Sequence, residues 1–139
     1  MAIETTFAII KPDAVEQGKA AAILAHIAGA GFKVRAIKRM HLSRAQAEGF
    51  YAEHKGRGFF DELCAFMSRS PVFVMALDGE NAVARWREVM GATDPAAAAE
   101  GTIRKVFGTS KGENATHGSD SAASAARELA YFFAGLELL

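Results

Sequence analysis

One stretch near the C-terminal end, residues 113–121, combines a titratable ring with small hydrogen-bonding side chains. It reads Glu-Asn-Ala-Thr-His-Gly-Ser-Asp-Ser, with His117 near its centre, and a helical pattern follows directly. A helix start offers free backbone N–H groups and a positive dipole end, where phosphate binds readily. An imidazole beside such a place can act as a nucleophile or as an acid and base. The alternative is structural: Ser119, Asp120 or Ser121 caps the helix and His117 is a loop residue.

Several basic side chains are candidates for holding phosphate near this histidine, namely Lys11, Arg87, Arg104 and Lys105. Lys11 ends the first apolar run, and open sheets tend to gather ligand groups at strand ends. Phosphoryl transfer needs several cations because negative charge spreads over the transferred oxygens. The planar fork of arginine can hold two of these oxygens at once. The alternatives are a charge at a helix C-terminus for Arg87 and a solvated surface position for Arg104.

Neutral donors and aromatic rings add to the candidate set. Thr93 and Asn114 can donate hydrogen bonds to phosphate or sugar. Tyr51 ends a predicted helix, and its hydroxyl can reach a phosphate or His117, or else extend to water. Phe59 follows a glycine-rich loop, so its ring either packs in the core or stacks on a base.

Glu128 is a candidate partner for the histidine ring. It lies well along the final predicted helix, so it reaches His117 only if the loop between them folds back. A carboxylate at one ring nitrogen would fix the tautomer and leave the other nitrogen free to attack. The alternative is a solvated pair between Glu128 and its neighbour Arg127.

Length, composition and charge exclude several other classes. The chain has 139 residues, half of them hydrophobic, which predicts a single domain over residues 1–139 with its own core. Sixteen basic residues balance sixteen acidic ones, so no global field recruits nucleic acid or anionic membrane. No apolar run approaches membrane-spanning length, and the N-terminus lacks a signal-peptide pattern. The only cysteine, Cys64, lies in an apolar helical pattern and is expected to be buried, which fits a reducing cytoplasm.

The usual phosphate-binding loops and metal-ligand patterns are missing from the sequence. Neither a Gly-x-x-x-x-Gly-Lys-Ser/Thr loop nor a Gly-x-Gly-x-x-Gly loop occurs. His26, His41 and His54 have no metal-ligand spacing with one another or with Cys64, so each is interpreted as structural.

Hydrophobic periodicity predicts the elements that position these residues. Strands are expected over 5–10, 32–42 and 71–77, with a further short strand near 115–116 just before His117. Helices are expected over 12–28, 43–54, 59–69, 80–90 and 120–133, with Ser43 as an N-cap and a turn at 78–79. Residues 91–112 are irregular, with short helical elements near 96–99 and 102–107. This order predicts an α+β fold, a ferredoxin-like βαββαβ sandwich whose four-stranded antiparallel sheet is covered by helices.

Several motifs in the same order make the chain resemble nucleoside diphosphate kinase over nearly its whole length. They are Asn-Ala-Thr-His-Gly-Ser-Asp-Ser at 114–121 and the segments 7–13, 49–54, 91–95, 101–104 and 125–133. The resemblance implies that His117 takes the γ-phosphoryl group of a nucleoside triphosphate through Nδ1 and passes it to a diphosphate, in covalent ping-pong catalysis.

The resemblance also implies the roles of the other candidates and the partners. Glu128 orients the ring, and Tyr51 and Ser119 support the histidine and the transferred group. Phosphates and ribose are bound by Lys11, Arg87, Thr93, Arg104 and Asn114, and Phe59 stacks on the base of many different nucleosides. Mg²⁺ arrives with the nucleotide phosphates, so no dedicated metal site in the protein is expected. Resembling proteins form homo-oligomers, and the apolar tail (Leu136, Leu138, Leu139) favours a tetramer over a hexamer or dimer.

Three positions depart from the pattern of the resembling proteins. Gly58 stands where proline is common, Arg69 where small residues are usual, and Val106 where an acidic residue is frequent. They affect the loop before Phe59 and the expected subunit packing, and none removes a catalytic residue.

Two other functions remain open at this point. βαββαβ sheets also occur in RNA- or nucleotide-binding modules without turnover, but the aromatic-basic strand motif of such modules is missing and no stable nucleic-acid partner is expected. A regulatory protein that keeps the fold without turnover is the other, and the intact set of His117, Lys11, Arg104 and Asn114 argues against it.

Overall fold

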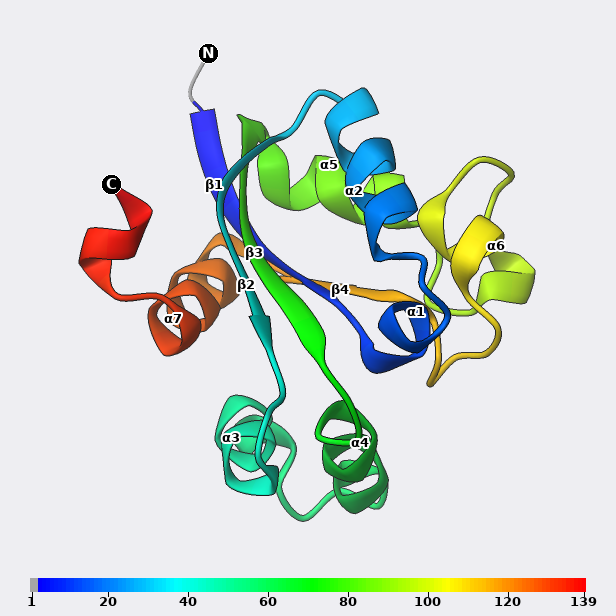
Figure 1. Ribbon diagram of the computed structural model, residues 1–139, viewed down its shortest axis with the longest axis vertical. Coiled ribbons are helices and arrows are strands. Elements are labelled where there is room, and N and C mark those ends of the chain that lie inside the picture. Colours follow the sequence, from blue (N-terminus) through cyan, green and yellow to red (C-terminus); the bar gives the residue numbers. More distant parts are fainter. Residues whose placement is uncertain (1–2) are drawn as a thin grey trace.

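The computed structural model describes residues 3–139, which form a four-stranded antiparallel sheet between two groups of helices (Figure 1). The strands are β1 (Ile3–Ile10), β2 (Lys33–Met40), β3 (Val72–Glu80) and β4 (Thr116–Gly118), and they lie in the order β2-β3-β1-β4. Both β3 and β4 pair antiparallel with β1. The predicted ferredoxin-like α+β sandwich is confirmed.

The central strand β1 explains the two-sided core. Its last residues are apolar and fully buried, and they point alternately to opposite faces. Phe7 and Ile9 belong to a core cluster shared with α3, α4 and α7, whereas Ala8 and Ile10 belong to a second cluster shared with α1, α2 and α5. In Figure 1, α7 accordingly lies on one side of the strands and α2 and α5 on the other.

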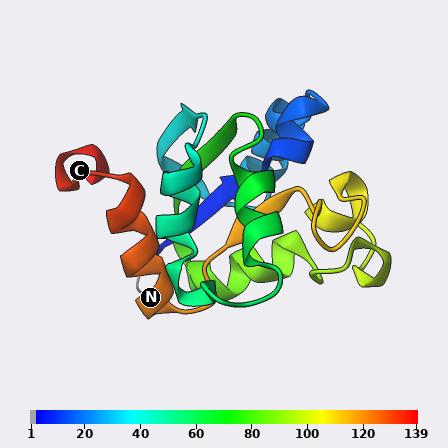
Figure 2. The same ribbon diagram turned by 90° about the horizontal axis from the view of Figure 1, so that it is seen from below.

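The helices cover the sheet in the predicted order, with different bounds. Seen from below, α3 and α4 lie side by side and form a hairpin next to the sheet (Figure 2). The α-helices are α1 (Pro12–Glu16), α2 (Ala20–Gly29), α3 (Arg44–Phe50), α4 (Phe60–Met67), α5 (Ala82–Met90), α6 (Ile103–Phe107) and α7 (Ala122–Phe132). Three 3₁₀-helices are Ala52–His54, Pro95–Ala97 and Gly135–Leu138.

Local sequence signals explain several of these elements. Ser43 caps α3 in a complete capping box with Gln46, as the sequence predicts at this N-terminus. Cys64 is fully buried, as expected from its place in the apolar pattern. β2 is an edge strand with alternating exposure, which agrees with its amphipathic pattern.

Three element predictions are wrong in detail. The expected helix 12–28 is two helices, because Gly18 adopts a φ of +72° and ends α1. The expected turn at Asp78-Gly79 is the continuation of β3, where Asp78 pairs with Thr5 of β1 and accepts a 2.6 Å hydrogen bond from its hydroxyl. The last strand contains His117 instead of ending before it.

Candidate active site

His117 lies in the middle of β4, where it pairs with Ile9 of the central strand. Its ring packs edge-on against Phe7 and Phe50, and about a fifth of its side chain is exposed to a cavity of about 250 Å³. The expectation that His117 sits at a helix start is therefore wrong. The helix start that follows is α7, and Ser121 caps it by accepting a hydrogen bond from the Ser124 backbone. The sheet, rather than a helix dipole, positions the ring.

A buried carboxylate holds one nitrogen of this ring. Nε2 of His117 lies 2.9 Å from Oε1 of Glu128, and the same oxygen accepts a 2.8 Å hydrogen bond from the Ser119 hydroxyl. Glu128 is 7% exposed, so the alternative of a solvated pair with Arg127 is excluded. An ionised carboxylate can only accept, so Nε2 carries the proton and Nδ1 of the neutral ring keeps its lone pair.

The surroundings of His117 favour its neutral form. Burial lowers the pKa of the ring, and the nearby charges of Lys11 and Arg104 act in the same direction, while Glu128 partly opposes them by raising the pKa. A neutral imidazole at neutral pH is the form that can attack an electrophile.

Lys11 is buried at the end of β1 and joins the two strands that carry the site. Its backbone N–H donates to the Ala115 carbonyl at 2.8 Å, and its Nζ donates to Oδ1 of Asn114 at 2.9 Å. The Asn114 amide in turn donates to the Thr93 carbonyl at 3.0 Å. Burial, assisted by the charge of Arg104, lowers the pKa of Lys11 to about 8. The three residues thus form one hydrogen-bonded chain beside His117.

Arg87 and Arg104 are two of the three arginines that line the cavity with His117. Arg104, on α6, donates to the Gly91 carbonyl at 3.1 Å and to the Thr116 carbonyl at 3.0 Å, which fixes its guanidinium. Its Nε is buried without a protein partner among the described residues. Burial and the neighbouring charge of Arg87 lower the pKa of Arg104 to about 10. Arg87 is exposed in the last turn of α5, and its side chain is available to a ligand.

Tyr51 lines the same cavity, but its hydroxyl makes no hydrogen bond to His117 in the part of the chain that the structure describes. Burial raises the pKa of this phenol, with the charge of Glu128 as a second cause. The phenol therefore stays protonated and can donate a hydrogen bond to a bound anion.

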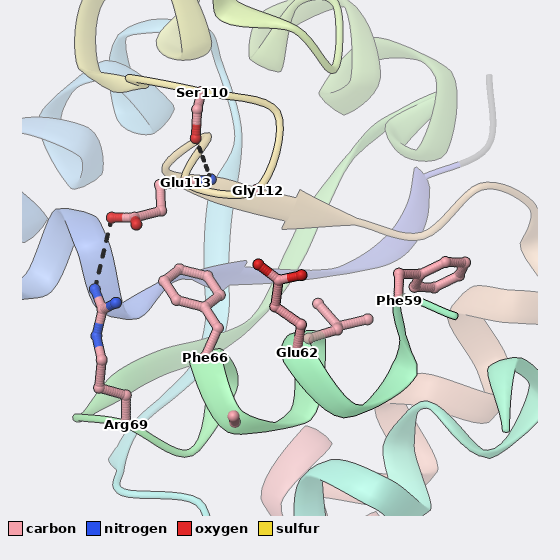
Figure 3. A pocket seen from close by; sticks show the side chains of 9 residues that line it. Phe59, Glu62, Phe66, Arg69, Ser110, Gly112 and Glu113 are labelled. Atoms are coloured by element: carbon pink, nitrogen blue, oxygen red, sulfur yellow. Dashed lines mark hydrogen bonds and ion pairs between the residues drawn. The ribbon is translucent and has the colours of Figure 1, made fainter. Parts of the chain in front are cut away.

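Phe59 lies apart from the chemistry, at one end of a second cavity of about 660 Å³. Figure 3 shows this cavity between α4 and the loop that carries Ser110, Gly112 and Glu113. The ring of Phe59 is 46% exposed, so it is a free flat surface rather than a core residue. His54 links the two cavities, since it lines the first and its ring lies 5.4 Å from that of Phe59.

Sequence reasoning missed a strained connection next to the histidine. Ala115 has a φ of +75°, which is unusual for a residue other than glycine, and its N–H donates to the buried carboxylate of Asp13 at 3.1 Å. This contact stabilises the backbone bend at Ala115, after which β4 pairs with β1. Asp13 and Ala115 are far apart in the sequence, so no local pattern indicates this contact.

Two further residues of the cavity were assigned other roles from sequence. The sequence predicts a structural role for His54, yet its Nδ1 is buried without a partner among the described residues and its ring borders the cavity. Arg127 pairs with Glu53 at 3.2 Å and donates to the Phe50 carbonyl, instead of pairing with Glu128. Sequence spacing carries no signal for either contact.

Within residues 3–139, no group of three or more His, Cys, Asp or Glu side chains is arranged to hold a metal ion. Apart from Glu128, which is engaged with His117, the cavity is lined by two acidic side chains, Glu53 and Asp120, and by several cationic ones. This residue set fits a metal that arrives bound to an anionic ligand. No helix in the described part of the chain is long and apolar enough to cross a membrane.

A carboxylate-held histidine facing arginine side chains, on an antiparallel ferredoxin-like sandwich, defines an α+β protein with a reactive site for anionic ligands. Comparison with known proteins identifies the family. A family model described as nucleoside diphosphate kinase matches residues 4–138. The chain therefore belongs to the nucleoside diphosphate kinase family.

Individual relatives agree with this assignment over nearly their full length. A nucleoside diphosphate kinase of Sorangium cellulosum is 67% identical, and the match covers 99% of this chain and 96% of that protein. A nucleoside diphosphate kinase of Geotalea uraniireducens is 60% identical, and the match covers 99% of this chain and 100% of that protein. Among solved structures, the Aquifex aeolicus nucleoside diphosphate kinase has a TM-score of 0.96 at 44% identity, and the match covers 99% of this chain and 100% of that chain. The Halobacterium salinarum nucleoside diphosphate kinase in complex with CDP has a TM-score of 0.94 at 39% identity, and the match covers 99% of this chain and 92% of that chain. Enzymes of this family act on nucleotides and need a divalent cation.

Proposed function

We propose that this protein transfers the γ-phosphoryl group of a nucleoside triphosphate to a nucleoside diphosphate through a phosphohistidine at His117. One observation carries the proposal: Nε2 is held by Glu128, which leaves the Nδ1 lone pair available in a cavity lined by arginines. Family membership supports the same reaction.

In the first half-reaction, Nδ1 of His117 attacks the γ-phosphorus. The bond between that phosphorus and the oxygen bridging it to the β-phosphate breaks, and its electron pair leaves with the diphosphate. Glu128 keeps the Nε2 proton in place and stabilises the positive charge that develops on the ring. In the second half-reaction, a terminal oxygen of another nucleoside diphosphate attacks the phosphohistidine and restores the neutral ring.

The remaining residues bind and orient the nucleotide in this proposal. Arg87 and Arg104 hold the transferred group and the neighbouring phosphates, since guanidinium groups stabilise the charge on equatorial oxygens. Tyr51 and the Thr93 hydroxyl donate further hydrogen bonds. Lys11 and Asn114 contact the phosphates and the ribose, and Ser119 supports the transferred group through Glu128.

The exposed ring of Phe59 stacks on the base. Stacking is possible for every base because each has a π-face, which supports the use of ATP, GTP, ADP, GDP and their deoxy forms. The bound CDP of the Halobacterium salinarum relative supports a nucleotide at this site.

We infer that Mg²⁺ is the divalent cation and that it enters with the nucleotide. When bound, it would neutralise part of the phosphate charge. The cationic lining around His117, whose carboxylates Glu53 and Asp120 are paired with Arg127 and Ser124, fits an ion carried by phosphates.

The assembly and the cellular setting belong to the same proposal. Residues 1–139 act as a single kinase domain. The exposed Leu136 and Leu139, at 78% and 90%, favour burial between subunits of a tetramer. The buried thiol of Cys64 suits the reducing cytoplasm.

Incubation with ATP labelled at the γ position tests the reaction. The protein is expected to take up acid-labile, alkali-stable label, which GDP or another diphosphate then removes. His117→Ala should take up none, while a matched change outside the cavity, His26→Ala, should label normally. Label that persists on His117→Ala, or that no diphosphate removes, contradicts the proposal.

A further inference from the structure

Arg69 occupies the far end of the cavity that begins at Phe59 (Figure 3). It follows the end of α4, and its guanidinium holds Glu16 of α1 as a fork: Nε donates at 2.9 Å to one carboxylate oxygen and Nη2 at 2.7 Å to the other. The hydroxyl of Ser70 also donates to Glu16. Two adjacent side chains therefore bind one carboxylate of α1.

The same guanidinium reaches the loop on the other side of the cavity. Its Nη2 lies 3.6 Å from Oε1 of Glu113, and Figure 3 shows this ion pair spanning the cavity end. The loop closes on Glu113, whose N–H donates to the Ser110 hydroxyl at 3.1 Å and whose carbonyl accepts from the Thr109 N–H at 2.9 Å. Holding Glu113 therefore holds the whole loop over 109–113.

The two carboxylates that Arg69 joins flank the hydrogen bond between Lys11 and Asn114. Glu16 ends the short helix that begins directly after Lys11, and Glu113 directly precedes Asn114. The Lys11–Asn114 bond is 2.9 Å long and buried. A single side chain at the surface thus connects both backbone segments that carry this pair.

The position of Arg69 itself is fixed. Its guanidinium carbon lies 4.9 Å from the centroid of the Phe66 ring, in cation–π geometry. Exposed ion pairs are usually weak, but a forked arginine–carboxylate contact within a network is the exception. Hydrogen bonding to Arg69 lowers the pKa of Glu16, so this carboxylate remains charged at neutral pH.

We propose that Arg69 is a positioning residue for nucleotide binding: it ties the loop 109–113 to α1 and thereby holds Asn114 against Lys11. The inference rests on the proposed function, in which Lys11 and Asn114 contact the nucleotide. Arg69 does not touch the reacting atoms, so it acts on the geometry of binding and leaves the phosphoryl-transfer step itself unchanged.

Steady-state kinetics of Arg69→Ala test this role. We expect the KM for a nucleoside diphosphate to rise about threefold to tenfold with kcat within about twofold, the pattern of lost binding without lost chemistry. Arg69→Lys should recover only part of the KM, because an ammonium cannot fork two oxygens. Combining Arg69→Ala with Glu113→Gln should raise the KM little beyond Arg69→Ala alone, because Arg69→Ala has already removed the contact with Glu113.

Arg35→Ala is the matched control, since Arg35 also makes two bonds to one carboxylate, Asp78, and its side chain is similarly exposed, at 37% against 42% for Arg69. It should leave the KM unchanged. An unaltered KM in Arg69→Ala, an equal rise in Arg35→Ala, or additive effects with Glu113→Gln would overturn the inference. In each of these outcomes the wild-type protein still takes up label from γ-labelled ATP. If the proposed function itself is wrong, the wild-type protein takes up no label.

Discussion

The cavity at His117 and the cavity at Phe59 are built in different ways. The smaller one, of about 250 Å³, contains His117 and is bounded by side chains anchored to the sheet and to buried carbonyls. The larger one, of about 660 Å³, begins at Phe59 and is bounded by α4 and the loop 110–113, whose side chains are mostly exposed. The anchored cavity suits chemistry, which tolerates little displacement, and the open one suits binding of varied bases.

Backbone pairing accounts for the difference. His117 lies on a strand paired with the central β1, so its position is set by ladder hydrogen bonds as well as by Glu128. The loop 110–113 belongs to no strand: the hydrogen bonds of Glu113 close the loop on itself, and Arg69 pairs with Glu113 from outside the loop. Changes in the first cavity should therefore reduce kcat, and changes in the second should raise KM.

The largest effect is expected for Arg104→Ala. In the proposed mechanism this guanidinium holds the transferred group, and removal of one such electrostatic contact typically costs about 10²–10³ in kcat. Measurement of kcat and of the melting temperature separates chemistry from folding, because Arg104 also bonds the Gly91 and Thr116 carbonyls. A kcat within threefold of wild type in a folded variant would remove Arg104 from the proposed mechanism.

Glu128→Gln should have the next largest effect. The amide keeps the shape but loses the charge that fixes the Nε2 proton, so we expect kcat to fall about tenfold to a hundredfold. Because Glu128 raises the pKa of His117, its neutralisation should also shift the acidic limb of the pH profile to lower pH. Ser119→Ala, which leaves the carboxylate in place, is the milder control. An unchanged acidic limb would contradict the assigned contact.

Phe59→Ala tests the open cavity. Loss of base stacking costs about 1–3 kcal/mol, so the KM should rise about tenfold while kcat changes little. Phe59→Trp should retain a low KM, since it keeps an aromatic face. A fall in kcat without a rise in KM would contradict the expectation that the Phe59 cavity contributes to binding and the His117 cavity to the chemical step.

The smallest effect concerns the pH dependence of binding. Burial lowers the pKa of Lys11 to about 8, so the lysine loses its proton as the pH rises from 7 to 9. A neutral lysine binds phosphate less well, so the KM for nucleotide should increase a few-fold over this range. This size corresponds to a partial loss of one contact, since about 1.4 kcal/mol of binding free energy changes the affinity tenfold. Lys11→Gln should show a higher KM that is flat between pH 7 and 9. A rise that persists in Lys11→Gln belongs to another group.

The fold was largely predictable from the sequence, and the errors have local causes. Apolar runs and caps such as Ser43 indicated most elements, and their order predicted the sheet. The break at Gly18 was missed because the apolar spacing continues across it. Asp78 and Gly79 look like a turn by composition, but their pairing with β1 is a long-range contact that overrides that local preference.

The sequence named candidate site residues but not the geometry in which the structure places them. The resemblance named the residues, whereas the contact between Glu128 and His117 depends on α7 folding back along the sheet after Ser119. The roles of Asp13 and Arg69 depend on partners about a hundred and about fifty residues away, respectively. Sequence periodicity contains no information about such pairs.

The central claim is that Glu128 holds Nε2 of His117 and leaves Nδ1 to attack. Nuclear magnetic resonance of the phosphorylated protein, labelled with ¹⁵N at histidine, distinguishes the two nitrogens through their coupling to ³¹P. We predict that the phosphorus is bonded to Nδ1 of His117 and that Nε2 retains its proton. A phosphorus bonded to Nε2 would contradict the account, because that nitrogen would then have to leave Glu128 before it could react.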